Sequence, residues 1–118
     1  MICTTTTQFD TPNAVLVYMG IPTHIKAFDY MLAALPLVAQ RVPICEIYRS
    51  VGESCGCSAW AVERGLRWAA GKSVGCLGCA ALDEIYGNTL PLSGVPTVAQ
   101  LLVTAARLAY GMLPYARA

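Results

Sequence analysis

Two arginines and a lysine lie close together in one segment of the chain, at Arg64, Arg67 and Lys72. The planar guanidinium of arginine donates two parallel hydrogen bonds, which match the two acceptors that guanine presents in the major groove of DNA. Arg64 and Arg67 are three residues apart, so they share one face if the segment is helical. The segment is therefore a candidate for contacts with base edges or phosphates. Glu63 stands four residues before Arg67, and an ordinary solvated ion pair is the competing interpretation for that arginine.

The residues before this segment favour a helix-turn-helix. Such a motif needs a small residue where its two helices cross and, four positions later, a residue that tolerates left-handed backbone in the tight turn. Gly52 and Gly56 meet these two requirements. Small or apolar residues occupy the surrounding packing positions, namely Val51, Cys55, Cys57, Ala59, Val62 and Leu66. Two ordinary packed helices joined by a glycine remain the alternative interpretation.

The second helix of this motif divides into two faces. The stripe expected to pack inward has apolar residues at spacings of three and four, which are Ala59, Val62, Leu66 and Ala69. The other side carries Trp60, Arg64, Arg67 and Gly71, with Ala61 and Trp68 at its margins. In a DNA-binding helix-turn-helix this outer side enters the major groove, and its N-terminal residues meet the base edges. Lys26, further towards the N-terminus, is interpreted either as a phosphate contact or as a solvated first-turn lysine.

Other side chains offer little catalytic or metal chemistry. A C-x-C pair at 55–57 and a C-x-x-C pair at 76–79 would together supply four thiolates for zinc. The first pair, however, occupies packing positions of the turn, where cysteine acts as a small buried hydrophobe. His24 is the only histidine, so no Ser-His-Asp triad can form. We therefore expect no enzymatic activity, no metal and no other cofactor.

The 118-residue chain as a whole is apolar and almost uncharged, with 56% hydrophobic residues, 13% charged residues and a net charge of +1. This composition excludes an intrinsically disordered chain, and it excludes the strongly basic surface of a general nucleic-acid binder. The longest uncharged stretch, 85–106, is broken by glycines and prolines and does not predict a membrane span. The N-terminal residues lack the features of a signal peptide. We therefore expect a cytoplasmic protein with reduced thiols and no membrane contact.

Helical spacing predicts an all-α domain of about six helices, with no convincing strand. Residues 1–10 are expected to form a polar tail, 11–113 a single helical domain with a central helix-turn-helix, and 114–118 a second tail. The first helix is expected to begin at Thr11-Pro12 and to end at Gly20.

The remaining helix boundaries follow from capping and breaking residues. The second helix is expected to begin at Pro22-Thr23, and Pro36 to end or kink it. Pro43 opens the third helix, and Ser58 caps a fourth that reaches about Lys72. Gly75 is expected to separate the fourth helix from a fifth over 76–86. Thr97 and Gln100 form a capping box, in which each side chain satisfies a backbone donor near the other, at the start of the last helix.

Several ordered motifs resemble the C-terminal DNA-binding effector domain of the stage-zero sporulation response regulator family of endospore-forming bacteria. Residues 19–26 (MGIPTHIK) resemble the family's G-[VI]-P-x-H-[IL]-K segment. Residues 58–67 (SAWAVERGLR) are similar to its serine- and threonine-rich turn and its R-V-E-R-A-I-R recognition helix. Residues 85–89 (IYGNT) and 96–97 (PT) resemble its [LF]-F-G-x-T loop and its P-T-N helix start. The resemblance covers almost the whole chain, from 14 to 110.

This resemblance implies a six-helix effector domain, comparable to winged-helix response-regulator effectors but without strands. It implies binding to a short, specific box in double-stranded DNA, often as tandem copies. It also implies that the final helix pairs two copies in a homodimer and that the surface near the fifth helix contacts an RNA polymerase sigma subunit. Glu63, Arg64 and Arg67 fall at DNA-facing positions of the family's recognition helix. The residues expected to contact DNA are Ser58, Trp60, Ala61, Glu63, Arg64, Arg67, Trp68 and Lys72.

The chain departs from the family pattern at reading positions. Ala61 stands where the family has its first recognition-helix arginine, and Trp68 stands where it usually has histidine. Trp60 occupies a position that is usually small and polar. Losing one bidentate pair with a base costs about 1–3 kcal/mol of discrimination. Only a tail is expected before the first helix, so we expect neither the family's receiver domain nor its switching by phosphorylation.

Two functional hypotheses follow from these residues. In the first, the chain is a sequence-specific DNA-binding regulator, which Arg64 and Arg67 favour. In the second, it is a protein-interaction module of the same fold that has lost DNA readout and pairs with itself or with a full-length relative. Trp60 and Trp68 favour the second hypothesis, because exposed aromatic side chains often anchor protein interfaces.

Overall fold

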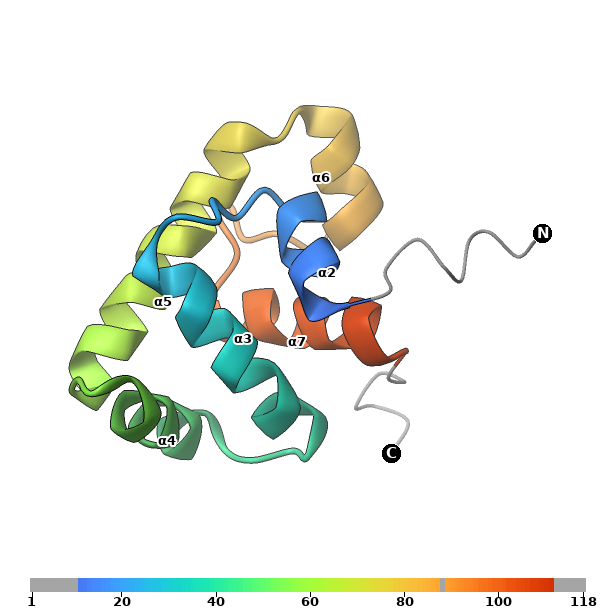
Figure 1. Ribbon diagram of the computed structural model, residues 1–118. Helices are drawn as coiled ribbons and strands as arrows, with labels where there is room; N and C mark the ends of the chain where they lie inside the picture. Colours follow the sequence, from blue (N-terminus) through green and yellow to red (C-terminus); the bar gives the residue numbers. More distant parts are fainter. Residues whose placement is uncertain (1–10, 88, 112–118) are drawn as a thin grey trace.

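The computed structural model describes residues 11–87 and 89–111 of the chain, and within them it is entirely helical (Figure 1). The described helices are α2 (Pro12–Tyr18), α3 (Lys26–Ala39), α4 (Ile44–Cys55), α5 (Ala59–Cys76), α6 (Cys79–Tyr86) and α7 (Val98–Tyr110). The expectation of an all-α fold with about six helices is confirmed for this part of the chain. The two predicted tails, 1–10 and 114–118, lie outside the described residues.

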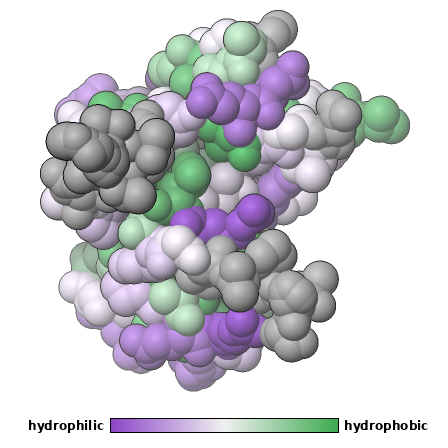
Figure 2. Space-filling view, turned by 90° about the vertical axis from the view of Figure 1, so that its right-hand side faces the viewer, coloured by the Kyte–Doolittle hydropathy of each residue, from purple (hydrophilic) through white to green (hydrophobic). Residues whose placement is uncertain are grey.

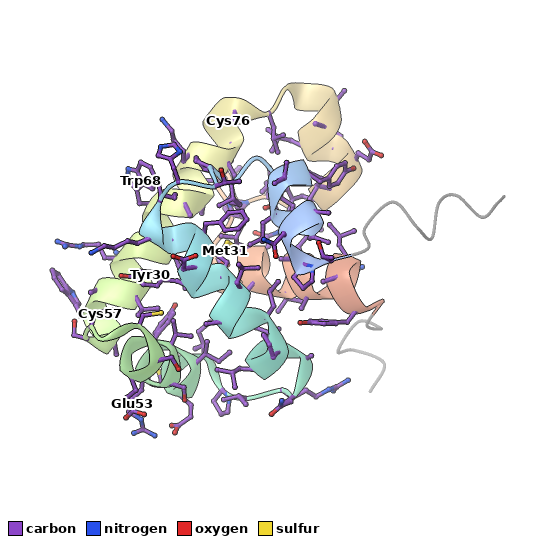
Figure 3. The ribbon with its side chains drawn as sticks, viewed as in Figure 1. Tyr30, Met31, Glu53, Cys57, Trp68 and Cys76 are labelled. Carbon is purple, nitrogen blue, oxygen red and sulfur yellow. The ribbon has the colours of Figure 1, made fainter. Side chains whose placement is uncertain are left out.

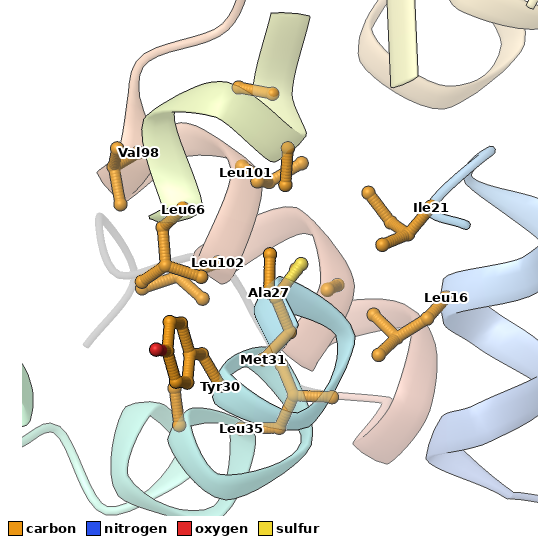
Figure 4. Packing of buried hydrophobic residues seen from close by; sticks show 14 of the residues in the cluster. Leu16, Ile21, Ala27, Tyr30, Met31, Leu35, Leu66, Val98, Leu101 and Leu102 are labelled. Atoms are coloured by element: carbon orange, nitrogen blue, oxygen red, sulfur yellow. The ribbon is translucent and has the colours of Figure 1, made fainter. Parts of the chain in front are cut away.

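Helix α3 lies at the centre of the fold and packs against α2, α4, α5 and α7. Its Met31 and Leu35 are fully buried and meet Leu66 of α5 and Leu102 of α7 in one hydrophobic core (Figure 4). Leu16 of α2 closes the core on the other side. Because α5 contributes buried residues along most of its length, the core fixes both its position and its rotation about its own axis.

The predicted N-terminal caps of three helices are confirmed. Side-chain oxygens of Thr11, Ser58 and Thr97 accept hydrogen bonds from backbone N–H groups three residues ahead, at 3.3, 3.0 and 3.1 Å. The other half of the expected capping box is wrong. The Gln100 side chain instead donates to the backbone oxygen and the hydroxyl of Thr89, at 3.0 and 2.9 Å, and so ties the preceding loop to α7.

The second helix begins later than expected, and of the two alternatives for Pro36 the structure excludes the helix end. Helix α3 begins at Lys26 rather than at Pro22-Thr23, because Ile25 has extended backbone while it packs against the core. Pro36 does not end the helix and lies inside it. Leu35 and Val38 on either side of Pro36 are buried, so their burial outweighs the backbone hydrogen bond that proline cannot make.

The fourth and fifth helices also divide at another place than predicted. Helix α5 continues past Lys72 and through Gly75 to Cys76, and α6 begins only at Cys79. Ser73 is fully buried, and its hydroxyl donates to the carbonyl of Ala70 at 2.9 Å. The last turns of α5 pack against Gly20, whose Cβ, if present, would lie 3.2 Å from the Ser73 carbonyl oxygen. These tertiary contacts outweigh the low helix propensity of glycine.

The flank of the molecule opposite α5 has a mixed surface. Figure 2 shows this flank, where hydrophilic and hydrophobic residues alternate over the parts that are not grey. None of the helices in the described residues is long and apolar enough to cross a membrane.

Candidate nucleic-acid interface

A close crossing of α4 and α5 sets the geometry of the candidate site. A Cβ added to Gly52 would lie 2.6 Å from the carbonyl oxygen of Cys57, a distance that real side chains do not reach. Gly56 ends α4 in left-handed backbone with φ of +76°. The Gly52 carbonyl accepts the backbone N–H groups of both Gly56 and Cys57. Both glycines that the sequence singled out are therefore required by the turn between the two helices.

The side chain of Tyr30, which sequence reasoning did not single out, holds α5 from the side of α3 (Figure 3). A Cβ added to Gly65 would lie 2.9 Å from the Tyr30 ring, so the glycine lets the ring approach the backbone of α5. The Cys57 thiol donates to the Tyr30 hydroxyl oxygen at 3.5 Å. The pKa of Tyr30 is raised to about 12, because the neighbouring Cys57, burial and Cys55 all disfavour a negative charge on the phenol oxygen. The one signal in the sequence was a glycine in the middle of an otherwise regular helix.

The packing positions predicted for the motif are occupied in most cases. Val51, Val62 and Leu66 are fully buried, and Ala59 and Cys57 are partly buried. Cys55 is exposed, so its expected role as a packing residue is wrong. It is the last residue of α4, where the chain turns away from the core.

The outer face of α5 carries two tryptophans, each with a cation four residues further on. The Arg64 guanidinium carbon lies 4.4 Å from the centre of the Trp60 ring. The Lys72 ammonium lies 5.7 Å from the centre of the Trp68 ring. Trp60 is 64% exposed and Trp68 52%, which is unusual for large aromatic side chains. Figure 3 shows Trp68 on the outer side of the helix.

Glu63 and Arg67 lie on a different flank of α5 and form a salt bridge, as the competing interpretation expected. The Glu63 side chain is only 20% exposed, whereas that of Arg67 is 68% exposed. Both border a groove of about 520 Å³ between α5, Tyr48 of α4 and the segment 91–99. Arg64 and Arg67 therefore differ: the first stacks on an aromatic ring and the second is paired with a carboxylate.

A second groove brings a residue of α3 next to the outer face of α5. It has a volume of about 540 Å³, and Ile25, Lys26 and Tyr30 line one side of it. Ala61, Arg64 and Trp68 line the other side. Lys26 thus joins Arg64 and Lys72 on this part of the surface, while the Ser58 hydroxyl is engaged in the cap of α5. Of the residues expected to contact DNA, Ala61 and Glu63 are partly buried, and the other six are exposed.

The two cysteine pairs are separated by the length of α5. Its 18 residues rise 1.5 Å each, which places Cys57 and Cys76 about 27 Å apart along the helix axis. A zinc site that includes both Cys57 and Cys76 is therefore excluded. Partial desolvation, together with the neighbouring Cys57 and Asp29, raises the pKa of Cys55, which keeps this thiol protonated at neutral pH. Cys45, Cys55, Cys57 and Cys76 are free thiols.

The chain was compared with known protein families, curated proteins and solved structures. No family model, no curated protein and no solved structure matches the chain.

Proposed function

We propose that this chain is a sequence-specific DNA-binding transcription regulator in which α4 and α5 form a helix-turn-helix and α5 reads the major groove. The observation that carries the proposal is Arg64, an exposed arginine near the start of a rigidly held helix, stacked on Trp60. Recognition helices of this motif read bases with residues of their first turns.

The stacking of Arg64 suits it to base readout. Contact with the indole covers the flat face of the guanidinium. The N–H groups of the guanidinium lie in its own plane and stay free to donate. The indole also restricts the side chain before binding, so less conformational entropy is lost when it engages a base. Arginine donating to guanine is the commonest specific contact in DNA complexes.

The other cations of this surface are proposed as phosphate contacts. Lys26 and Lys72 lie on the two sides of Arg64, on α3 and on the later part of α5. Arg67 has to exchange the carboxylate of Glu63 for a phosphate. Since Ala61 has no side chain that donates hydrogen bonds, we expect the target box to differ from the one read by the effector domains that the sequence resembles.

A binding selection followed by a matched pair of variants tests the proposal. Random duplex DNA retained by the purified protein is sequenced, and affinity for the enriched sequence is measured by fluorescence anisotropy. We expect Arg64→Ala to weaken binding by about 1–3 kcal/mol and to relax the preference at one base position. Arg107→Ala on α7 removes the same charge from an exposed site elsewhere and is expected to leave affinity nearly unchanged. No enrichment over denatured protein, or equal effects of the two variants, would refute the proposal.

The exposure of Trp60 and Trp68 favours a second candidate, a protein-interaction module of the same fold. Tryptophan and arginine are the residues most often found at the energetic centres of protein interfaces. For both candidate functions we propose two protein partners. One is a second copy of the chain, paired through α7, and the other is an RNA polymerase sigma subunit, contacted by the surface near α6. Sedimentation of the protein alone over a range of concentrations separates self-association from DNA binding.

A further inference from the structure

Four side chains follow one another at four-residue intervals along the outer face of α5: Trp60, Arg64, Trp68 and Lys72. We name this set the tryptophan–cation stripe. Each interval is about 6 Å of helix rise, so along the helix axis the stripe extends about 18 Å and its two tryptophans are separated by about 12 Å. Both cations lie over the indole that precedes them. Aromatic surface and positive charge therefore alternate along one line, and both are exposed.

The two exposed indoles have no good stacking or hydrogen-bonding partner in a fully paired duplex. In the major groove a duplex offers the edges of its bases, while the faces are covered by stacking on their neighbours. An indole has one N–H donor and no acceptor, so it cannot form the bidentate pairs by which side chains read base edges. Its large flat surface is best buried against the face of an unpaired base, and such stacking is the usual device of proteins that bind single strands.

The charges around the stripe favour a polyanion as the partner. The only carboxylate on α5 is Glu63, which is mostly buried on the other flank and paired with Arg67. Lys26 adds a third cation at the groove of about 540 Å³ beside Trp68. A lipid surface fits less well, because a membrane-binding helix separates its apolar face from its charged face. Here the apolar face of α5 is buried in the core, and the exposed tryptophans share their line with the cations.

We infer that the tryptophan–cation stripe binds unpaired nucleotides, with bases stacking on Trp60 and Trp68, phosphates contacting Lys72 and Lys26, and Arg64 kept as the contact to a base edge. This inference rests on the proposed function, since α5 remains the helix that contacts DNA, and it adds that the site read by α5 includes a locally opened part whose unpaired bases stack on the tryptophans. The preferred partner is a locally opened duplex, whose paired flank still offers a major groove. A single strand supplies the stacking contacts alone, and a fully paired duplex lacks them and binds more weakly.

Trp60 and Trp68 are the only tryptophans of the chain, so intrinsic fluorescence reports directly on the proposed contacts. The variants Trp60→Phe and Trp68→Phe each leave one tryptophan and resolve the two positions. The probes are oligothymidylate of roughly 20 nucleotides, which exceeds the site sizes of known single-strand binders, a mixed-sequence duplex of equal length, and the same duplex with a central mismatched bubble. Titration is followed by quenching and by anisotropy.

We expect the single strand and the bubble to quench the emission of both one-tryptophan variants and to bind more tightly than the duplex. Trp68→Leu is expected to lower affinity for oligothymidylate about 5- to 150-fold, the range that base–aromatic stacking contributes. Tyr110→Leu is the matched control, because Tyr110 is also an exposed aromatic residue but lies on α7. Near-normal affinity of this control, with a loss for Trp68→Leu, supports the inference.

Three results would overturn the inference, and they differ in what they leave standing. If the duplex binds as tightly as the single strand and without quenching, the inference fails while the proposed function stands. If none of the oligonucleotides binds, both fail. If vesicles containing phosphatidylserine, or a rise in protein concentration alone, shift the emission to the blue and no oligonucleotide does, the stripe serves a membrane or a second copy of the chain instead.

Discussion

Glycine has two opposite roles along α4 and α5. At Gly52 the carbonyl oxygen of Cys57 occupies the place of a Cβ, whereas at Gly71 the space within 4 Å is open. We expect Gly52→Ala to lower the free energy of unfolding by about 1–3 kcal/mol, because the two helices have to move apart. Gly71→Ala is expected to raise it by about 0.4–1 kcal/mol, since alanine restricts the unfolded chain and suits a helix interior. Urea denaturation of both variants measures the two effects. Equal effects would contradict the close crossing.

Tyr86 is expected to make the protein less stable as the pH rises into the alkaline range. The residue is 5% exposed, and burial raises its pKa to about 12. Above pH 10 the unfolded chain releases the phenolic proton, while the folded protein retains it up to about pH 12, so the unfolded state gains stability across this interval. The free energy of unfolding is therefore expected to fall by up to about 1.4 kcal/mol per pH unit between these values from this residue.

The variant Tyr86→Phe isolates this contribution. Within the described part of the chain the Tyr86 hydroxyl has no hydrogen-bond partner, so its removal is not expected to lower stability at neutral pH. Urea denaturation of both proteins is repeated from pH 8 to the alkaline limit of reversible folding. The difference between them should grow in favour of the variant above about pH 10. A difference that is the same at every pH would show that Tyr86 titrates alike in the folded and unfolded states.

At the scale of the element, variants of the N-cap residue Ser58 allow the stability of α5 and its proposed binding to DNA to be measured separately. The Ser58 hydroxyl accepts the backbone N–H of Ala61, so Ser58→Ala should lower the free energy of unfolding by about 1 kcal/mol. Aspartate is also a good N-cap, and Ser58→Asp is expected to keep most of the stability. It also places a negative charge next to Trp60 and should weaken DNA binding more than Ser58→Ala. The reverse order of affinities would place the DNA away from this end of α5.

The elements themselves were largely predictable from the sequence, and their ends were not. Thr11, Ser58 and Thr97 cap their helices through contacts with residues three positions ahead, which a sequence displays. Pro36 was expected to end or kink a helix and Gly75 to separate two helices, and both lie inside one. In each case buried neighbours hold the helix together, and burial depends on the packing of distant segments.

The geometry of the candidate site was predictable only in part, for the same reason. The spacing of Gly52 and Gly56 indicates a tight turn because the constraint is local. The contact of Tyr30 with Gly65 joins α3 to α5, and residues so far apart in the chain have no characteristic spacing by which the contact could be predicted. The spacing of Glu63 and Arg67 indicated their ion pair, but the burial of Glu63 beside the segment 91–99 follows from the tertiary fold.

At the scale of the whole molecule, a net charge of +1 hides an uneven distribution. Four of its eight lysines and arginines, at positions 26, 64, 67 and 72, lie on α5 or beside it, with Glu63 as the only acidic residue of that helix. A protein that neutralises phosphates releases counterions, and the slope of log affinity against log salt is about −0.9 per phosphate contact. Arg64 is proposed to contact a base, so the three other cations predict a slope of about −3 for this protein on duplex DNA.

Each cation that contacts a phosphate is expected to contribute its own part of this salt dependence. Arg67→Ala is expected to make it shallower by about 0.9, whereas Arg107→Ala on α7 should leave it unchanged. Glu63→Gln releases Arg67 from its salt bridge and removes the carboxylate nearest to the proposed phosphates, so affinity should rise, most clearly at low salt. Anisotropy titrations at several salt concentrations measure all four slopes. If Arg107→Ala changed the slope as much as Arg67→Ala, binding would follow the total charge of the molecule, and the positive surface of α5 would not be where DNA is held.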